Sequence, residues 1–120
     1  MKALVVDENE GVRESLSVLL KRRGIQPVLA GNAAAAMERF SEDQFDLLVT
    51  NLDVPGTNGL ELIRWIRTRS PFLPIIVLSE NLSSDGESTG GLMHARVAQT
   101  GLDSEGVDAA ISSMLEQLHD

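Results

Sequence analysis

Short apolar runs alternate along this chain with longer segments in which apolar residues recur every three or four positions. The short runs are rich in Val, Ile and Leu and predict strands, clearly at residues 2–6, 46–51 and 74–79 and less clearly at 26–30 and 94–98. The helical spacing predicts helices between and after them, over residues 10–23, 32–40, 58–69 and 104–118. Strand and helix therefore alternate along most of the sequence.

Residues typical of helix and strand ends support these boundaries. Glu10 stands in the first turn of the first predicted helix, basic residues stand in its last turn, and a glycine follows as a stop. Asn32 and Asn58 are each able to cap the start of a helix. Pro27 cannot donate a backbone hydrogen bond, so the strand at 26–30 is predicted at an edge of the sheet.

The alternation weakens after the fourth predicted strand. Residues 80–91, ENLSSDGESTGG, are rich in Ser, Gly and acids and contain one apolar residue. So little apolar surface cannot offset the entropy cost of ordering the chain, which predicts a long loop or a frayed short helix. The fourth helix and the fifth strand at 94–98 are therefore expected to be weak.

Apolar strands separated by helices predict a parallel sheet that is covered on both faces. The fold class expected is α/β, a doubly wound five-stranded parallel sheet with helices on both faces. Binding sites in such sheets form beyond the carboxyl ends of the strands, where the strand order reverses.

Composition narrows the classes of function. With 120 residues, 42% of them hydrophobic, the chain suits one domain over residues 1–120 with a real core. Its 10 basic and 18 acidic residues give a net charge of −8, which argues against direct binding to nucleic acid or to an anionic membrane. The absence of cysteine excludes disulfides, thiolate zinc sites and cysteine nucleophiles. The sequence contains no signal peptide or apolar run of membrane-spanning length, which favours a cytoplasmic protein.

Oxygen-bearing side chains stand at the ends of three predicted strands. Asp7 and Glu8 follow the first strand, Asn51 ends the third with Asp53 two residues further on, and Ser79 ends the fourth. With the first and third strands adjacent, these residues would meet at one edge and form an oxygen-rich pocket. Any one of them alone is more typical of a solvated loop residue, but their placement at matched strand ends favours the pocket.

Three stretches resemble the receiver domain of bacterial two-component response regulators, which has a CheY-like, flavodoxin-like fold. They are LVVDENEGVRESL near the start, FDLLVTNLDVPGTNGLELIRWIR in the middle and PFLPIIVLS after it. Together they cover residue 1 to about residue 79, and the last predicted helix matches again. The middle stretch is most similar to receivers that precede the ATPase domain of transcription activators of the NtrC kind.

The resemblance implies a role for each residue of the predicted pocket. In the family, an Asp at the end of the third strand takes a phosphoryl group from a phosphohistidine, and counting back from the following proline places Asn51 at that position. Asp7 and Glu8 match the two acids that hold Mg²⁺, and Asp53 falls where a backbone carbonyl is the third ligand. Ser79 matches the hydroxyl that bonds the phosphoryl group.

Three positions depart from the family pattern. The lysine that should neutralise the phosphoryl charge falls on Thr100, and the aromatic switch residue of the fifth strand falls on Val97. Asn51 carries an amide, whose nitrogen lone pair is delocalised and whose oxygen has no full charge, so it is a poor nucleophile. Phosphoryl transfer depends on positioning and charge stabilisation, and both the nucleophile and the cation are missing at these positions.

Two other interpretations retain phosphorylation. Asp53 could be the acceptor, but two residues along a strand is roughly 6.6 Å, too far for the same in-line geometry unless the loop refolds. Alternatively, Asn51 is an engineered replacement for Asp in an otherwise normal receiver. The missing lysine and aromatic residue argue against such a single change.

Metal binding at the predicted pocket is expected to be weak. Without the lysine, Asp7, Glu8 and Asp53 repel one another, so either an ion binds or one acid takes up a proton. No phosphate would complete the octahedral shell of Mg²⁺, so a Mg-type site here would be weak or empty.

The leading hypothesis is a receiver-like module that cannot accept phosphate in the usual way and that regulates transcription through protein–protein contacts. Its partners would be an output domain in the same or another chain, a sensor kinase, and a second copy of itself in a homodimer. The chain could then be the N-terminal module of a longer regulator. The dimer contact is predicted on the last helix, at Val107, Ile111 and Met114, or on the first helix.

A hypothesis from another class is a small-ligand sensor or a hydrolase on the same kind of sheet. The sequence offers no nucleophile, no general base near pH 7 and no Gly-rich phosphate loop, so no enzyme activity is expected. His94 and His119 are interpreted as solvated side chains rather than ligands. Trp65, which stands among three arginines, is either packed locally or part of a partner surface.

Overall fold

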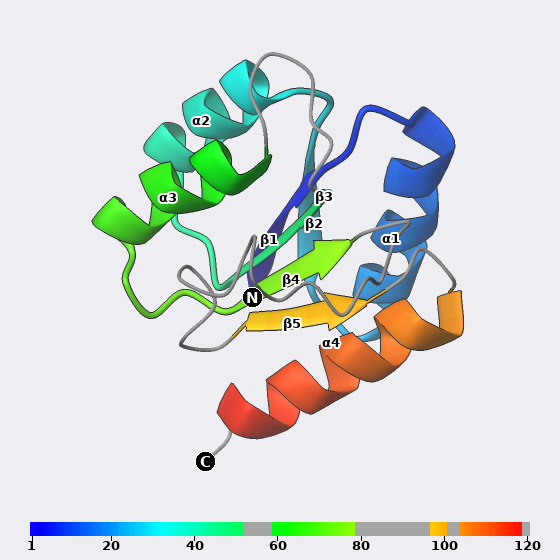
Figure 1. Cartoon of the computed structure of the whole chain (residues 1–120). Coiled ribbons are helices and arrows are strands. Elements are labelled where there is room, and N and C mark those ends of the chain that lie inside the picture. The colour runs from blue at the N-terminus through cyan, green and yellow to red at the C-terminus, as the bar shows by residue number, and fades with distance from the viewer. Residues whose placement is uncertain (52–58, 79–96, 101–103, 119–120) are drawn as a thin grey trace.

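The computed structural model describes residues 1–51, 59–78, 97–100 and 104–118, and these residues form five strands and four helices (Figure 1). In chain order the elements are β1 (Lys2–Val6), α1 (Glu10–Arg22), β2 (Gln26–Ala30), α2 (Ala33–Glu42), β3 (Leu47–Asn51), α3 (Gly59–Arg69), β4 (Ile75–Leu78), β5 (Val97–Thr100) and α4 (Ser104–Leu118). The strands form one sheet in the order β2-β1-β3-β4-β5, and every neighbouring pair is parallel.

This strand order confirms the predicted doubly wound sheet. The chain runs from β1 outward to β2 and then crosses back to β3 on the other side of β1. The strand that contains Pro27 is at an edge, as predicted from its missing backbone donor. Helices α2 and α3 cover one face of the sheet, and α1 and α4 cover the other (Figure 1).

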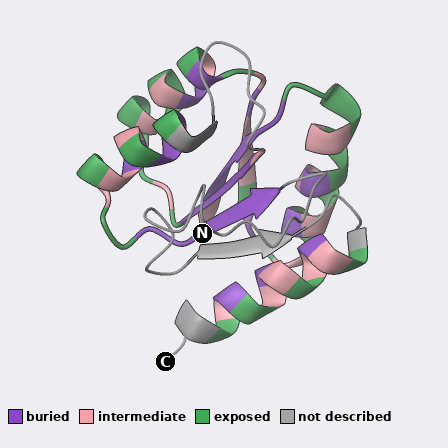
Figure 2. Cartoon of the chain, viewed as in Figure 1, coloured by how far each residue is buried: buried purple, intermediate pink, exposed green. Residues whose placement is uncertain are grey.

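Alternation along the strands separates two apolar cores. In β1, Leu4 and Val6 pack in the core beneath α2 and α3, whereas Ala3 and Val5 pack in the core beneath α1 and α4. All four side chains are fully buried. β1, β3 and β4 are largely purple in Figure 2, whereas the edge strand β2 is mostly intermediate and each helix buries only one side. Burial on both faces is the reason why these strands are continuous apolar runs in the sequence.

The residues predicted to form a dimer contact on the last helix are core residues instead. Val107 is 2% exposed, Ile111 0% and Met114 2%, and all three lie in the same core as the buried face of α1. The prediction was wrong at these positions because the apolar face of α4 covers β4 and β5 inside the domain. On α1, the other predicted contact, Val18 is 49% exposed.

The fifth strand ends later than predicted. β5 comprises Val97–Thr100, and its four residues pair with the four residues of β4. The prediction stopped at residue 98 because it followed apolar side chains, whereas backbone pairing with β4 also accommodates Gln99 and Thr100. Residues 94–96 lie outside the described residues, as does the segment 80–91 for which a loop or short helix was expected.

Asparagine side chains cap two helices. Asn32 caps α2 as predicted, because its Oδ1 accepts a hydrogen bond from the Ala35 N–H at 2.7 Å. Asn9, which the sequence analysis did not single out, caps α1 by accepting from the Val12 N–H at 3.1 Å. The expected cap at position 58 lies outside the described residues. After α1 the chain turns at Gly24, whose φ of +74° explains the glycine.

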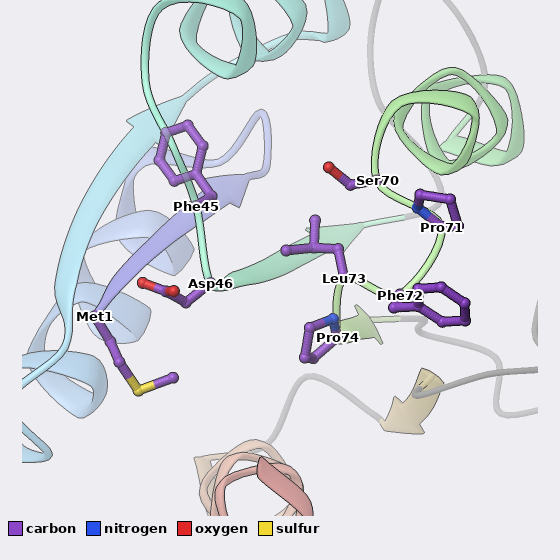
Figure 3. Close-up of a pocket in the computed structure, with 8 residues that line it drawn as sticks. All are labelled: Met1, Phe45, Asp46, Ser70, Pro71, Phe72, Leu73 and Pro74. Atoms are coloured by element: carbon purple, nitrogen blue, oxygen red, sulfur yellow. The ribbon is translucent and has the colours of Figure 1, made fainter.

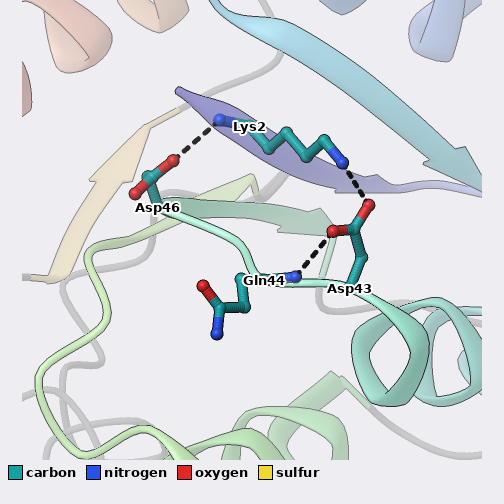
Figure 4. A network of polar contacts seen from close by, with 4 residues as sticks. All are labelled: Lys2, Asp43, Gln44 and Asp46. Carbon is teal, nitrogen blue, oxygen red and sulfur yellow. Dashed lines mark hydrogen bonds and ion pairs between the residues drawn. The ribbon is translucent and has the colours of Figure 1, made fainter.

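Polar contacts at the amino ends of the strands join β1 to the segment before β3 (Figure 4). The backbone N–H of Lys2 donates to Asp46 Oδ2 at 2.8 Å, and its ammonium group forms an ion pair with Asp43. Asp43 also accepts a hydrogen bond from the Gln44 N–H at 2.8 Å. The hydrogen bond from Lys2, followed by that from Gln44, lowers the pKa of the Asp43 carboxyl below its ordinary value. These contacts help to set β1 beside β3.

Candidate functional site

The candidate site lies at the carboxyl ends of β1 and β3. Val6 pairs with Thr50 in the parallel register of these strands, so Asp7 and Asn51 are opposite each other where the strands end. Thr50 is fully buried, and its hydroxyl donates to the Asn51 carbonyl oxygen at 3.1 Å. Asp7 and Asn51, which are 44 positions apart in the sequence, are brought together because their strands are neighbours, as predicted.

The Asp7 side chain is buried and hydrogen-bonded through both of its carboxylate oxygens. It is 2% exposed. Its Oδ1 accepts from the Asn9 N–H at 2.9 Å, and its Oδ2 accepts from the Asn51 amide nitrogen at 3.1 Å. A buried carboxylate without such donors would carry a large desolvation cost. The Asn51 amide thus acts as a hydrogen-bond donor to the acid beside it.

Arg13 of α1 also belongs to this site, and the sequence analysis did not identify it. Its Nη1 donates to the backbone carbonyl oxygen of Asp7 at 2.6 Å. A basic residue early in a helix is unfavourable for the helix dipole unless it contacts an acceptor, but the sequence does not show which acceptor Arg13 contacts.

The other predicted site residues are not brought into a described contact with Asp7. Glu8 is exposed. Thr100 ends β5 opposite Leu78, so its backbone reaches the same edge of the sheet, but its side chain lies outside what the structure describes. Asp53 and Ser79 also lie outside the described residues. Their predicted roles therefore stay predictions.

A metal site of the expected kind is not assembled by the part of the chain that the structure describes. Among those residues, no group of three or more His, Cys, Asp or Glu side chains is placed to hold an ion. Both oxygens of Asp7 already accept hydrogen bonds, from a backbone N–H and from an amide. A hard divalent cation prefers several anionic or carbonyl oxygens at once, so these residues do not by themselves fit one.

Two hollows on the surface are lined by residues other than Asp7 and Asn51. One, of about 350 Å³, lies beside α1 and α4 and is lined by Asn9, Gly11, Val12, Ser15, Leu16, Leu19, Leu78 and Val107. The other, of about 540 Å³, lies at the opposite, amino edge of the sheet and is lined by Met1, Phe45, Asp46 and Ser70–Pro74 (Figure 3). Its walls are mostly apolar, and Phe72 on its rim is 72% exposed. Asp7 and Asn51, the candidate site residues, do not line this second hollow.

Trp65 has close packing partners within the domain. Its ring meets Phe40 edge to face, with ring centroids 5.8 Å apart, and the Arg69 guanidinium lies 3.8 Å from the Trp65 ring centroid. These contacts account for Trp65 as local packing, one of its two interpretations. His94 and His119 lie outside the described residues. None of the helices in the described ranges is long and apolar enough to span a membrane.

A sequence model of the response regulator receiver domain matches residues 3–95 of this chain. Among curated proteins, the response regulator PilR of Pseudomonas aeruginosa is 33% identical over 84 residues, which are 70% of this chain and 19% of PilR. The response regulator MprA of Mycobacterium avium is 37% identical over 92 residues, 77% of this chain and 40% of MprA. The chain therefore spans less than half the length of these relatives.

Solved receiver structures share the fold. The response regulator TrrA of Thermotoga maritima, solved in complex with Mg²⁺ and BeF, superposes with a TM-score of 0.80 at 22% identity, covering 94% of this chain and 97% of TrrA. A receiver protein from Pseudomonas putida gives a TM-score of 0.79 at 28% identity, covering 97% of this chain and 95% of that one.

Receiver domains are generally signalling modules rather than catalysts, although they can autophosphorylate. They commonly bind Mg²⁺ at the phosphorylation site, and they interact with sensor kinases and output domains. The match over residues 3–95 identifies a receiver domain. The sheet order and the pairing of β1 with β3 agree with that identification. The chain thus belongs to the response regulator receiver domain family of two-component signalling.

Proposed function

We propose that this receiver domain does not accept a phosphoryl group in the usual way, and that it regulates transcription through protein–protein contacts. The observation that supports the proposal is the 3.1 Å hydrogen bond from the Asn51 amide nitrogen to the Asp7 carboxylate. A side chain at the phosphoacceptor-equivalent position is thereby used as a hydrogen-bond donor, which is the opposite of a nucleophile's role.

The chemistry of an amide supports the same proposal. A carboxylate acceptor attacks phosphorus with a charged oxygen and gives a neutral acyl linkage, whereas attack by an amide oxygen would leave a cationic imidate. The amide also suits the resting pocket better than a carboxylate would. Asn51 can donate to buried Asp7, while a second carboxylate 3.1 Å away would repel it.

The remaining residues of the pocket enter the proposal with the roles that the family pattern implies. Glu8 and Asp53 would complete an acidic corner with Asp7, Ser79 would be the switch hydroxyl, and Thr100 occupies the lysine-equivalent position. Thr100 cannot supply the ammonium group that neutralises a phosphoryl group. Any Mg²⁺ site formed by these acids would therefore be weak.

We propose, further, that residues 1–120 are a single receiver module and that its partners are proteins. Its relatives PilR and MprA are response regulators that extend well beyond the matched segment. An output domain, a sensor kinase or a second copy of the chain would then contact the surface of the module. For a homodimer, α1 remains the candidate surface, since Val18 is 49% exposed there.

The test is incubation of the purified protein with a small phosphodonor, such as acetyl phosphate, and Mg²⁺, followed by intact-mass measurement. The expected result is no added mass. The double variant Asn51→Asp, Thr100→Lys, which restores both the nucleophile and the cation, should gain about 80 Da, the mass of one phosphoryl group, which hydroxylamine then removes because acyl phosphates are labile to it. The variant shows that donor, metal and assay are competent.

A hydroxylamine-sensitive adduct of the same mass on the unchanged protein would contradict the proposal. The variant Asp53→Ala then separates the two phosphorylating alternatives. Loss of the adduct in that variant would identify Asp53 as the acceptor.

A further inference from the structure

The hollow at the amino edge of the sheet gathers exposed apolar side chains. Among the described residues, three large apolar side chains are exposed: Phe72 at 72%, Met1 at 50% and Val18 at 49%. Phe72 and Met1 both line the hollow of about 540 Å³, whereas Val18 lies on α1 (Figure 3). Apolar side chains that are exposed singly are ordinary, but two of them at one apolar hollow mark a contact surface.

The turn that carries Phe72 is held in place by the rest of the fold. The Arg67 guanidinium donates from Nη1 to the Ser70 carbonyl oxygen at 3.2 Å and to the Leu73 carbonyl oxygen at 2.6 Å, so it joins the two sides of the turn. Leu73 is 7% exposed and packs in the core beneath α2 and α3. The turn also contains two prolines, which restrict φ. An aromatic side chain on such a turn loses little conformational entropy on binding, which suits an anchor of an interface.

The same hollow contains a carboxylate that no described cation neutralises. Asp46 is exposed and lines the hollow. Its Oδ2 accepts a hydrogen bond at 2.8 Å from the backbone N–H of Lys2, which is a neutral group, whereas the Lys2 ammonium group is paired with Asp43 (Figure 4). Neither of the two ion pairs formed within the described ranges includes Asp46. The hollow therefore offers apolar walls with one negative charge beside them.

A second hollow, of about 610 Å³, continues this surface between the ends of α2 and α3. The residues that line both hollows are Phe45, Asp46 and Ser70. Asp43 lines the second hollow, and so does Arg69, whose guanidinium lies over the Trp65 ring at 3.8 Å from its centroid. The surface thus changes from apolar around Phe72 to polar around Asp43, with the Asp46 carboxylate between them.

From these features we infer that the amino edge is a docking site for a protein segment in which a bulky apolar side chain stands next to a lysine or arginine. The apolar side chain would pack against Phe72 and Met1, and its basic neighbour would pair with Asp46. The chain's net charge of −8 favours a cationic partner. A second copy of the chain fits less well, because a two-fold contact through Phe72 would bring the Asp46 carboxylates of both copies toward one another.

This docking site lies at the edge of the sheet opposite Asp7 and Asn51. It names the chemistry of a partner segment, and it rests on the proposed function only in that the module works through protein contacts. Phosphorylation has no part in it.

The test is selection of random peptides displayed on phage against the immobilised protein, followed by titration calorimetry with a selected peptide. The enriched peptides should place a large apolar residue next to lysine or arginine. Phe72→Ala should weaken binding of the selected peptide roughly tenfold, as loss of an interface anchor does. Val18→Ala removes an exposed apolar side chain elsewhere, on α1, and should leave the affinity unchanged.

The charge is tested separately with Asp46→Asn, which keeps an oxygen that can accept from the Lys2 N–H. This variant should also bind the peptide more weakly, and its affinity should depend less on salt concentration than that of the unchanged protein. Glu14→Gln, at an exposed position on α1, controls for the change in net charge and should bind normally. Added peptide should shift the backbone amide NMR signals of residues 45–46 and 70–73 most.

Three outcomes would overturn the inference: no enriched peptides or enriched peptides without this apolar and basic pair, equal affinity in Phe72→Ala and Val18→Ala, or a dimer in sedimentation that Phe72→Ala dissociates. The last outcome would assign the surface to a second copy of the chain. A phosphoryl adduct in the mass experiment would contradict the proposed function and leave the peptide result standing, so the two failures are distinguishable.

Discussion

The two edges of the sheet hold their acids in different ways. At the carboxyl edge, Asp7 is 2% exposed, and its carboxylate and carbonyl oxygens together accept hydrogen bonds from Asn9, Arg13 and Asn51. At the amino edge, Asp43 and Asp46 are exposed and contact Lys2, beside an apolar hollow of about 540 Å³ (Figures 3 and 4). Burial thus distinguishes two sets of polar contacts that look similar in the sequence.

This difference in burial predicts where a substitution should change the free energy of unfolding most. Removing a partner from a buried carboxylate leaves an unsatisfied charge and costs the desolvation that the partner had offset. An exposed ion pair is screened by water and salt and contributes little. At the amino edge, apolar packing should therefore dominate the energetics, whereas at the carboxyl edge the polar contacts should dominate. The predictions that follow are ordered from the largest expected effect to the smallest.

The largest effect is expected from apolar packing at the amino edge. Leu73 is 7% exposed and belongs to the core beneath α2 and α3, and the Arg67 guanidinium donates to its carbonyl oxygen at 2.6 Å. Leu73→Ala should lower the free energy of unfolding by about 2–4 kcal/mol through lost burial and a cavity. The neighbouring Phe72→Ala, at a side chain that is 72% exposed, should change it by less than about 0.5 kcal/mol.

Urea unfolding followed by Trp65 fluorescence measures both variants. Similar losses for Leu73→Ala and Phe72→Ala would show that Phe72 contributes to stability despite its exposure, and would contradict the assigned burial.

A smaller effect is expected from a charge introduced at the carboxyl edge. Asn51→Asp replaces the donor to Asp7 with a second carboxylate, so in metal-free buffer at neutral pH the free energy of unfolding should fall by roughly 2 kcal/mol. Added Mg²⁺ should restore part of the loss, because the ion binds the folded pocket. Asn51→Ala, which removes the donor without adding charge, is the matched control and should show no recovery with Mg²⁺.

Thermal unfolding with and without Mg²⁺ measures this effect. If Asn51→Asp were as stable as the unchanged protein in metal-free buffer, the Asn51–Asp7 contact would have no part in balancing the pocket.

The smallest effect is expected from the exposed ion pair at the amino edge. Lys2 lowers the pKa of Asp43 below its ordinary value of 3.8, chiefly by the side-chain hydrogen bond. A carboxyl whose pKa is depressed on folding contributes stability above its unfolded pKa and loses it as the pH falls through the folded value. The contribution is therefore present at neutral pH and disappears only in acid below about pH 3.8.

NMR titration of the Asp43 carboxyl measures this shift directly. Lys2→Met should raise the pKa of Asp43 toward its ordinary value while leaving the urea midpoint at neutral pH unchanged, because both groups are exposed to solvent. Lys21→Met, at an exposed position on α1, should leave the Asp43 titration as it is. A clear stability loss in Lys2→Met alone would mean that the ion pair is energetically more like the buried contacts.

The positions of most elements and part of the candidate site could be predicted from the sequence. The apolar runs of β1, β3 and β4 are buried on both faces, so their side chains carry an unambiguous signal. Asp7 and Asn51 could be paired in advance because they end strands that the fold places side by side. Contacts that depend on side-chain direction could not be predicted. Arg13 was missed because its acceptor is a backbone carbonyl, which every residue possesses.

The predicted dimer contact on the last helix was wrong because the same residues were compatible with two kinds of burial. The apolar face of the last helix was compatible with a dimer contact or with the domain core, and Val107, Ile111 and Met114 are used by the core. Hydrophobic periodicity shows that a face must be buried but not against what. Likewise, β5 reaches Thr100 because β4 offers it a pairing partner there, although its side chains gave little strand signal.

The amino-acid sequence by itself determined the order of strands and helices, the parallel sheet and the amide of Asn51 at the end of β3, since periodicity and residue identity are local properties. Only the tertiary structure decided that the Asn51 amide donates to buried Asp7 and that the last helix faces the core. It also decided that the Arg13 guanidinium, beside Gly31, donates to the Asp7 carbonyl oxygen. Those features depend on distances between segments far apart in the chain, which are fixed when the two apolar cores pack against the sheet.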